Sequence, residues 1–319
     1  MILQFDDVVL TPQKCVVASR NECDTTATLG KNTFAVPVVA ANMKSILTKK
    51  ICKQFDKENW FYVYHRINGV KNVEKFVEYA NDKGAFNVVS ISVGIKPEWV
   101  KFVRKCKNKG HYIDYFTVDV AHSHTENVLP ILRAIREHYP DAYVICGNGC
   151  TKEWVQWLES YNLVDCIKVG IGVSKACRTR EHTGFGSSTL GSLIECVEAS
   201  NDDIMSDGGH QQIGDIAKAI AFGADWVMSG GLFAKCIDSP AVVNGYYGNA
   251  SRDAKGNDHV EGENVKVETN GLTIKEQMKL IQESLRSSIS YAGKTDVGGL
   301  YKTPYQIAAD PYWWLYKTS

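Results

Sequence analysis

The stretch DIMSDGGHQQIGDIAKAIAFGADWVMSGG (203–231) decides the fold. It contains two short apolar runs, 203–209 and 225–231, each ending in a pair of glycines, with a helix-like segment between them. Both runs are continuously apolar rather than alternating, which is typical of parallel strands covered on both faces. A strand, a helix and a second strand in this order are the repeating unit of parallel α/β folds. We therefore expect a parallel sheet with helices packed against it.

Six more runs of the same kind precede this stretch. They are PVVAAN (37–42), FYVYH (61–65), FNVVSIS (86–92), DYFTVD (114–119), AYVICGN (142–148) and CIKVG (166–170). Helix-like patterns fill the gaps: apolar residues at i, i+3, i+4 and i+7 predict helices over 99–106 and 128–135. Eight strand–helix units favour a closed (β/α)8 TIM barrel. A doubly wound open sheet is the alternative, although such sheets seldom contain eight regular units.

The chain, 1–319, is expected to form a single barrel domain, and two segments fall outside the repeat. An N-terminal extension covers 1–36, and a polar segment rich in glycine and asparagine covers about 238–273. The second segment follows the eighth predicted strand, at the face where barrel enzymes carry their chemistry. We interpret it as an active-site flap. A disordered surface insertion is the alternative.

Composition limits the classes of function. The 36 Lys and Arg residues balance 36 Asp and Glu residues, so a nucleic-acid-binding surface is not expected. No apolar run approaches the roughly 18 residues that a membrane span needs, and the N-terminus is unlike a secretory signal. The ten cysteines form no CxxC pair, which predicts a cytoplasmic protein without a disulfide scaffold or structural zinc.

Polar residues and glycines follow nearly every predicted strand, at the rim where barrel enzymes place their catalytic groups. The pairs Gly208-Gly209 and Gly230-Gly231 favour a phosphate site, because exposed backbone N–H groups can donate to phosphate oxygens. Ordinary strand-to-helix turns also use glycines, so that alternative stays open. Asp207 either accepts hydrogen bonds from ribose hydroxyls or caps a helix.

Cys177 differs from the other nine cysteines because it lies in a polar, glycine-flanked loop, KVGIGVSKACRTREHTGFG (168–186). Lys175, Arg178 and Arg180 surround it in the sequence, and neighbouring cations lower a thiol pKa and raise the thiolate fraction. Cys177 is therefore a candidate covalent nucleophile. The alternative is a small buried residue like the other cysteines.

The loop GIGVSKACRTREHTGFG (170–186) resembles the catalytic loop of the inosine monophosphate dehydrogenase/GMP reductase family, GxGxGxxCxT followed by TGxG. FDDVVLTPQK, PVVAANM, MSDGG, GDIAKAIAFGADWVMSGG and YYGNAS resemble the same family in the same order, from about residue 4 to 293. Three features resemble the reductase branch. The dehydrogenase's paired regulatory domain is missing, SRNECDTTATLG (19–30) and DVAHSHTE (119–126) look like reductase segments, and HVEGENVKV (259–267) carries the reductase's flap glutamate.

This resemblance implies a specific reaction, the NADPH-dependent reductive deamination of GMP to IMP and ammonia. Cys177 would form a thioimidate with the purine, and Thr179 and Glu261 would handle the protons. The residues implied for the substrate are Asp207, Gly208, Gly209, Gly230, Gly231, Tyr247, Gly248 and Asn249. Those implied for the cofactor are Ser92, Asp119 and Asn148. The resemblance also implies a monovalent cation (K+) at the carbonyls of Gly170, Gly172 and Cys177, and a homotetramer.

The chain departs from the family pattern at several positions. Val173 and Ser174 replace a proline and a glycine of the catalytic loop, and Glu263 stands where lysine is usual. GNGC (147–150) and Asn249 are also unusual. Three alternatives therefore stay open: dehydrogenase-like oxidation, a divergent purine (deoxy)nucleotide reductase, and a catalytically silent nucleotide-binding subunit. The survival of the proposed catalytic residues favours a working enzyme.

Overall fold

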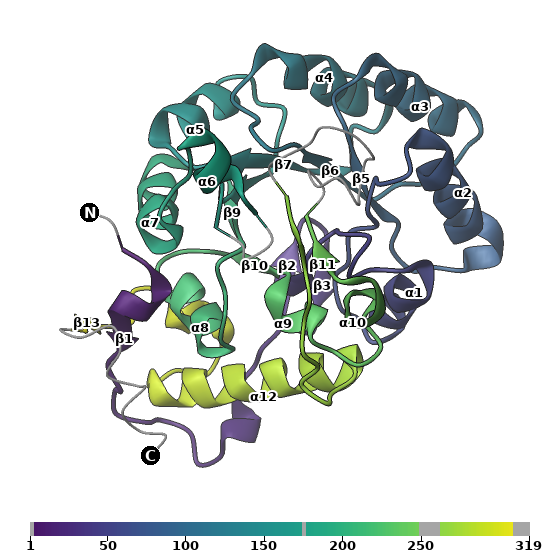
Figure 1. Cartoon of the computed structure of the whole chain (residues 1–319). Helices are drawn as coiled ribbons and strands as arrows, with labels where there is room; N and C mark the ends of the chain where they lie inside the picture. Colours follow the sequence, from purple (N-terminus) through teal and green to yellow (C-terminus); the bar gives the residue numbers. More distant parts are fainter. Residues whose placement is uncertain (1–2, 174–176, 249–261, 309–319) are drawn as a thin grey trace.

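The computed structural model describes residues 3–173, 177–248 and 262–308. Its central sheet has seven parallel strands in the order β4-β10-β9-β8-β7-β6-β5. The strands are β4 (Val38–Ala40), β5 (Ser90–Val93), β6 (Tyr115–Asp119), β7 (Tyr143–Gly149), β8 (Cys166–Val169), β9 (Asp203–Asp207) and β10 (Trp226–Ser229). Because β4 pairs with β10, the first and last strands of this sheet lie side by side and the sheet curls (Figure 1). The α/β class and the parallel sheet predicted from the sequence are confirmed.

Residues 61–65, predicted as a strand, form only a single β-bridge. Tyr64 forms an isolated parallel bridge with Ile91, and its carbonyl accepts the backbone N–H of Ser92 at 2.8 Å. Within the described residues, no ladder joins this run to β4. The sheet is therefore a curled, TIM-barrel-like sheet of seven strands, and full closure through an eighth remains a prediction.

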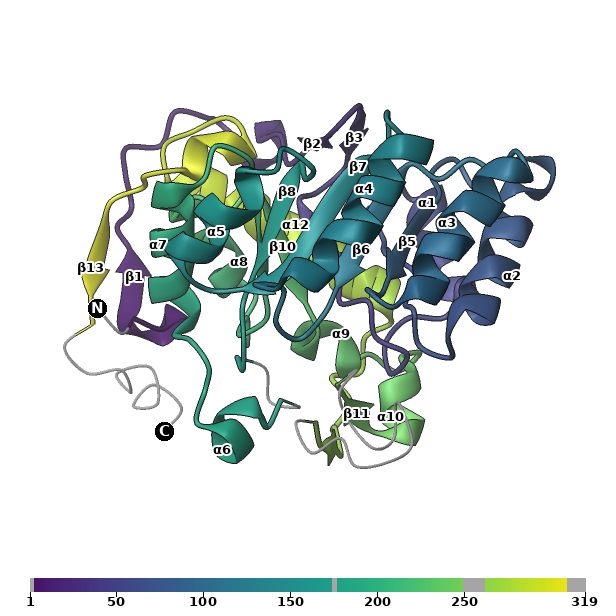
Figure 2. The ribbon, with the colours of Figure 1, turned by 90° about the horizontal axis from the view of Figure 1, so that it is seen from above.

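Helices follow the strands, and most of them cover the outside of the sheet (Figure 1), whereas α6 and α10 lie beyond the strand carboxyl ends (Figure 2). They are α1 (Lys49–Lys57), α2 (Val70–Asn81), α3 (Pro97–Asn108), α4 (Leu129–His138), α5 (Lys152–Glu159), α6 (Thr179–Thr183), α7 (Thr189–Ala199), α8 (Gly214–Ala221), α9 (Gly231–Ala234), α10 (Pro240–Asn244) and α12 (Ile274–Tyr291). Short 3-10 helices lie at Phe5–Asp7, Arg20–Glu22, Asp82–Gly84, Glu126–Val128 and Val297–Leu300. The apolar spacing that predicted α3 and α4 is confirmed, since those residues are buried against the sheet. No helix in the described ranges has the length and apolarity to cross a bilayer.

Part of the N-terminal extension closes the end of the sheet opposite the strand carboxyl ends. The hairpin of β2 (Ala27–Leu29) and β3 (Asn32–Phe34) lies at that end (Figure 2). Phe34 packs between Phe61, Tyr115 and Trp226, with ring centroids 5.3, 6.2 and 5.7 Å away. These aromatic rings fill the space between the strands, so this end supplies stability and leaves the other end open for ligands.

The predicted flap begins and ends in ordered structure. β11 (Tyr246–Tyr247) pairs with β12 (Asn264–Val265) in an antiparallel ladder that follows α10, on the same side of the molecule as α6 (Figure 2). The rest of the flap, 249–261, lies outside the described residues. A third two-stranded sheet joins β1 (Val8–Leu10) to β13 (Tyr305–Ile307) and brings the two ends of the described chain together.

Candidate active site

A cavity of about 680 Å³ opens at the carboxyl ends of the parallel strands. Its walls come from the ends of β4, β6, β7, β9 and β10, from the loop after β8, and from both described flanks of the flap. Its volume lies in the range of small-molecule sites. The expectation that the strand-end residues gather in one place is therefore met for most of them.

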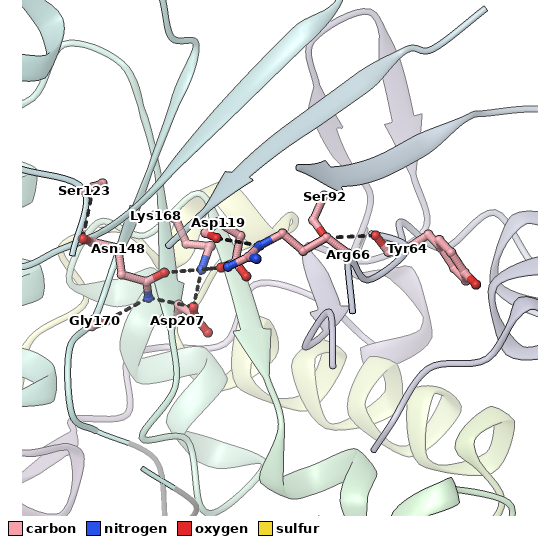
Figure 3. A network of polar contacts seen from close by, with 9 residues as sticks. All are labelled: Tyr64, Arg66, Ser92, Asp119, Ser123, Asn148, Lys168, Gly170 and Asp207. Atoms are coloured by element: carbon pink, nitrogen blue, oxygen red, sulfur yellow. Dashed lines mark hydrogen bonds and ion pairs between the residues drawn. The ribbon is translucent and has the colours of Figure 1, made fainter. Parts of the chain in front are cut away.

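A buried polar network forms the floor of this site (Figure 3). The ammonium of Lys168, in β8, donates to Asp119 Oδ1 at 3.1 Å, Asn148 Oδ1 at 2.5 Å and Asp207 Oδ2 at 2.5 Å. Asn148 Nδ2 in turn donates to Asp207 Oδ2 at 2.8 Å and to the Gly170 carbonyl at 2.7 Å. The four strands β6, β7, β8 and β9 and the loop after β8 are thus joined through one lysine and one asparagine.

The charges within this network stabilise one another. Burial alone would lower the pKa of Lys168, but Asp207 and Asp119 raise it above its usual value, so the ammonium stays protonated. For Asp119 the directions are opposite. Burial alone would raise the pKa of its carboxyl group, but the positive charges of Lys168 and Arg66 lower this pKa below its usual value. Arg66 also fixes the strand end by donating from Nε to the Asp119 carbonyl at 2.8 Å.

Cys177 lies at the edge of the cavity, half-buried. Its Sγ is 3.1 Å from Thr179 Oγ1, within hydrogen-bonding distance for sulfur. Its backbone forms an antiparallel bridge with Gly262, and the neighbouring Arg178 forms an ion pair with Glu263. The loop that carries the candidate nucleophile is therefore held directly against the end of the flap.

The glycine turns after β9 and β10 leave no room for side chains at three of their four glycines. Gly208 and Gly209 have φ of 89° and 81°, in the left-handed region that glycine adopts without strain. A Cβ at Gly208 would come within 2.9 Å of Val173, and one at Gly230 within 2.3 Å of the Tyr246 hydroxyl. Around Gly231, by contrast, no atom lies within 4 Å of such a Cβ. The turns thus place bare backbone at the cavity wall.

Most of the site residues predicted from the sequence line this cavity. They are Asp119, Asn148, Gly170, Gly172, Cys177, Thr179, Asp207, Gly208, Gly209, Gly230, Gly231 and Gly248. Two predicted residues are not brought to it. Ser92 is fully buried and donates to the Tyr64 carbonyl at 3.0 Å, and Tyr247 is buried behind the wall, where its carbonyl accepts from Ser45. Glu261, Asn249 and Ser174 lie outside the described residues.

Several residues that the structure places in or under the site were not predicted from the sequence. Lys168 is the most important, and its signal was a charged residue in the middle of the buried run CIKVG. Arg66 and Tyr246 line the cavity, as does the flap segment 265–270. Successive residues of a strand point to opposite faces. Tyr246 therefore faces the cavity, and the predicted Tyr247, one position further along β11, faces away from it.

Comparisons with known proteins find similarity over nearly the whole chain. The model of the "IMP dehydrogenase / GMP reductase domain" matches residues 2–303. A protein named "GMP reductase" from Staphylococcus carnosus (strain TM300) is 39% identical over 317 residues, which cover 96% of each chain. Another protein of that name, from Staphylococcus aureus (strain bovine RF122 / ET3-1), is 38% identical over the same share. The match spans the sheet, the Cys177 loop and the flap, and the chain belongs to the IMP dehydrogenase/GMP reductase family.

Proposed function

We propose that this protein is a GMP reductase, an oxidoreductase that converts GMP to IMP and ammonia with NADPH as the reductant. The observation that carries the proposal is the position of Cys177, 3.1 Å from Thr179, on the same cavity as the glycine turns and Asp207. A nucleophile, a hydroxyl able to relay a proton and a site for a nucleotide are then within one small volume.

The nucleotide is held through its phosphate and ribose in this proposal. Backbone N–H groups of the turns at Gly208-Gly209 and Gly230-Gly231 donate to the phosphate, and Asp207 accepts from the ribose hydroxyls. Gly248 lines the cavity and Tyr247 packs behind it, while the proposed contact of Asn249 lies outside the described residues. Because these contacts involve only the phosphate and the ribose, the purine is free to approach Cys177.

The reaction proceeds in two steps. Cys177 Sγ forms a bond to C2 of the purine, the amino group takes up a proton, the C2–N bond breaks, and ammonia leaves a thioimidate. NADPH, held on the Asp119–Asn148 side of the cavity, would supply a hydride for C2. Cys177 Sγ would then leave C2 as the thiolate, with release of IMP. The overall balance is GMP, NADPH and one proton giving IMP, NADP+ and ammonia. Thr179 and Glu261 exchange protons with the amine and ammonia, since an amine leaves only when protonated.

The cofactor would lie along the Asp119–Asn148 side of the cavity, whose two polar side chains both line it. Ser92 supports this wall through its bond to Tyr64 rather than by touching the cavity. A K+ ion at the carbonyls of Gly170, Gly172 and Cys177 is part of the proposal, with one lone pair of the Gly170 carbonyl already engaged by Asn148. The same proposal includes NADPH rather than NADH, a homotetramer and a cytoplasmic location.

Cofactor oxidation tests the function directly. The purified protein should oxidise NADPH with GMP and release ammonia, and Cys177→Ala should reduce turnover by about 10³-fold or more while still binding GMP. Parallel assays with dGMP and with IMP plus NAD separate the other activities: a deoxynucleotide reductase prefers dGMP, and a dehydrogenase forms XMP. Undiminished turnover in Cys177→Ala would refute the covalent mechanism.

Thiol labelling separates an enzyme from a silent binding subunit. Cys15 is exposed, and hydrogen bonds, chiefly with Ser290, lower the pKa of its thiol, so it competes for iodoacetamide. The experiment therefore uses a Cys15→Ser background. Iodoacetamide should then label Cys177, and GMP should protect it. Absence of both labelling and turnover would favour the silent subunit.

A further inference from the structure

Lys168 occupies a buried strand position at which an apolar residue would be sufficient for folding. It lies in the middle of β8, and its side chain is 1% exposed. A buried ion pair is seldom more stabilising than well-packed apolar side chains of similar size. The flanking residues Ile167 and Val169 are apolar and buried, so the lysine is an exception within its own strand. Stability alone does not account for it.

All three N–H donors of the Lys168 ammonium have acceptors, and two of these acceptors are carboxylates on strands β9 and β6. An ammonium has three N–H donors, and Lys168 has three acceptors: Asp207 Oδ2, Asn148 Oδ1 and Asp119 Oδ1. Asp207 ends β9, next to β8, whereas Asp119 ends β6, two strands away on the other side. The lysine therefore reaches across the inner face of the sheet (Figure 3).

These contacts leave Asp207 with one oxygen held and one available. Oδ2 accepts from both Lys168 and Asn148, while no hydrogen bond reaches Oδ1 from the described residues. Asp207 also lines the cavity, with its side chain 18% exposed. A carboxylate fixed through one oxygen presents the other in a defined direction, which is what recognition of a hydroxyl pair requires.

We propose that Lys168 is a positioning residue that holds Asp207 as a fixed acceptor for the ribose hydroxyls and holds Asp119 on the cofactor side through the same ammonium. The inference rests on the proposed function, because it assigns the ribose to Asp207. It makes the affinity for the ribose hydroxyls, and not the affinity for the rest of the nucleotide, depend on Lys168.

Calorimetric binding of GMP and of 2′,3′-dideoxy-GMP to Lys168→Met tests this dependence. The wild-type protein should bind GMP more tightly than the dideoxy form. Lys168→Met should weaken GMP binding by roughly 10- to 100-fold and leave the dideoxy form nearly unchanged, so that the ratio of the two affinities approaches one. Equal weakening of both ligands, or no weakening of either, would overturn the proposal.

Two further variants keep the test decisive. Lys168→Met leaves two carboxylates without their cation, so if circular dichroism shows that it does not fold, Lys168→Met/Asp119→Asn removes one negative charge and is judged by the same ratio. Lys218→Met is the control, because Lys218 is a half-buried lysine that is likewise ion-paired, with Asp215 at 3.3 Å, but lies away from the cavity; its ratio should equal that of the wild type. A wild type that binds neither nucleotide refutes the proposed function itself, whereas a variant ratio equal to that of a GMP-binding wild type refutes only the role of Lys168.

Discussion

Single residues of the site differ in how far the sequence predicts them. Asp119 and Asp207 could be predicted, because parallel strands align their carboxyl ends and each aspartate ends an apolar run. Lys168 could not, since its role depends on which strands lie beside β8 and on a side chain that reaches past its neighbour. Ser92 ends a similar run but faces the Tyr64 carbonyl, which shows that a strand-end position does not specify the direction of the side chain.

Buried histidines give the protein a defined response to acid. Burial lowers the pKa of His210 to about 4, and His65 has a similarly low pKa for the same reason. Between pH 6.5 and 4 the unfolded chain binds a proton at each histidine and the folded protein does not. As the pH decreases through this range, the free energy of unfolding therefore falls by up to about 1.4 kcal/mol per pH unit for each histidine. Chemical denaturation at pH 7 and pH 5 should show this loss, and His210→Gln should reduce it. Ser206→Ala, which removes only the 3.0 Å partner of His210, should keep the wild-type pH dependence; an equal change in both variants would contradict the assignment.

At the level of elements, the apolar runs predicted β4 to β10 well because each run is local. The run at 61–65 was predicted as a strand and forms only a bridge, because strand formation requires neighbours on both sides that the run itself does not specify. The ordered flanks of the flap were not predicted either. The pairing of β11 with β12 joins residues on either side of 249–261 in the sequence, and composition indicates only that such a segment is polar.

The Cys177 loop and the flap are two elements joined by an ion pair that should affect turnover more than stability. Arg178 contacts Glu263 of the predicted flap and also Glu181 of α6, the helix that begins directly after Arg178. Glu263→Lys should lower kcat/KM for GMP by up to about fivefold, with little change in the free energy of unfolding because both partners are partly exposed. Glu181→Lys makes the same charge change without touching the flap and should leave kcat/KM close to wild type. Equal losses in the two variants would show that only the charge near Arg178 matters.

Helix α12 depends on its first turn. Thr273 accepts the backbone N–H of Glu276 at 3.2 Å, and Glu276 accepts that of Thr273 at 2.8 Å, which together form a capping box. Thr273→Ala should lower the free energy of unfolding by about 1 kcal/mol. Ser284→Ala, at a half-buried position of the same helix where the hydroxyl donates to the Leu280 carbonyl at 2.7 Å, should cost nothing or stabilise slightly. Denaturant titrations of both variants compare the two effects.

The whole molecule separates stability from chemistry along the axis of the sheet. The β2–β3 hairpin fills one end, and the cavity opens at the other. Phe34→Ala should therefore cost about 3–5 kcal/mol and leave the affinity for GMP unchanged under conditions where the protein is folded. Tyr112→Ala, whose side chain is 79% exposed, should change neither property. A GMP affinity that falls along with stability in Phe34→Ala would show that the two ends are coupled.

The burial of the tryptophans has a practical consequence for spectroscopy. Trp60, Trp99, Trp154 and Trp226 are buried, Trp157 is half-buried, and none of these five lines the cavity. Their intrinsic emission should respond strongly when the core is exposed to water, and only weakly when a small molecule occupies the mouth of the sheet. Emission from these five indoles is thus suited to following denaturation, while ligand titrations are better followed by heat or by absorbance.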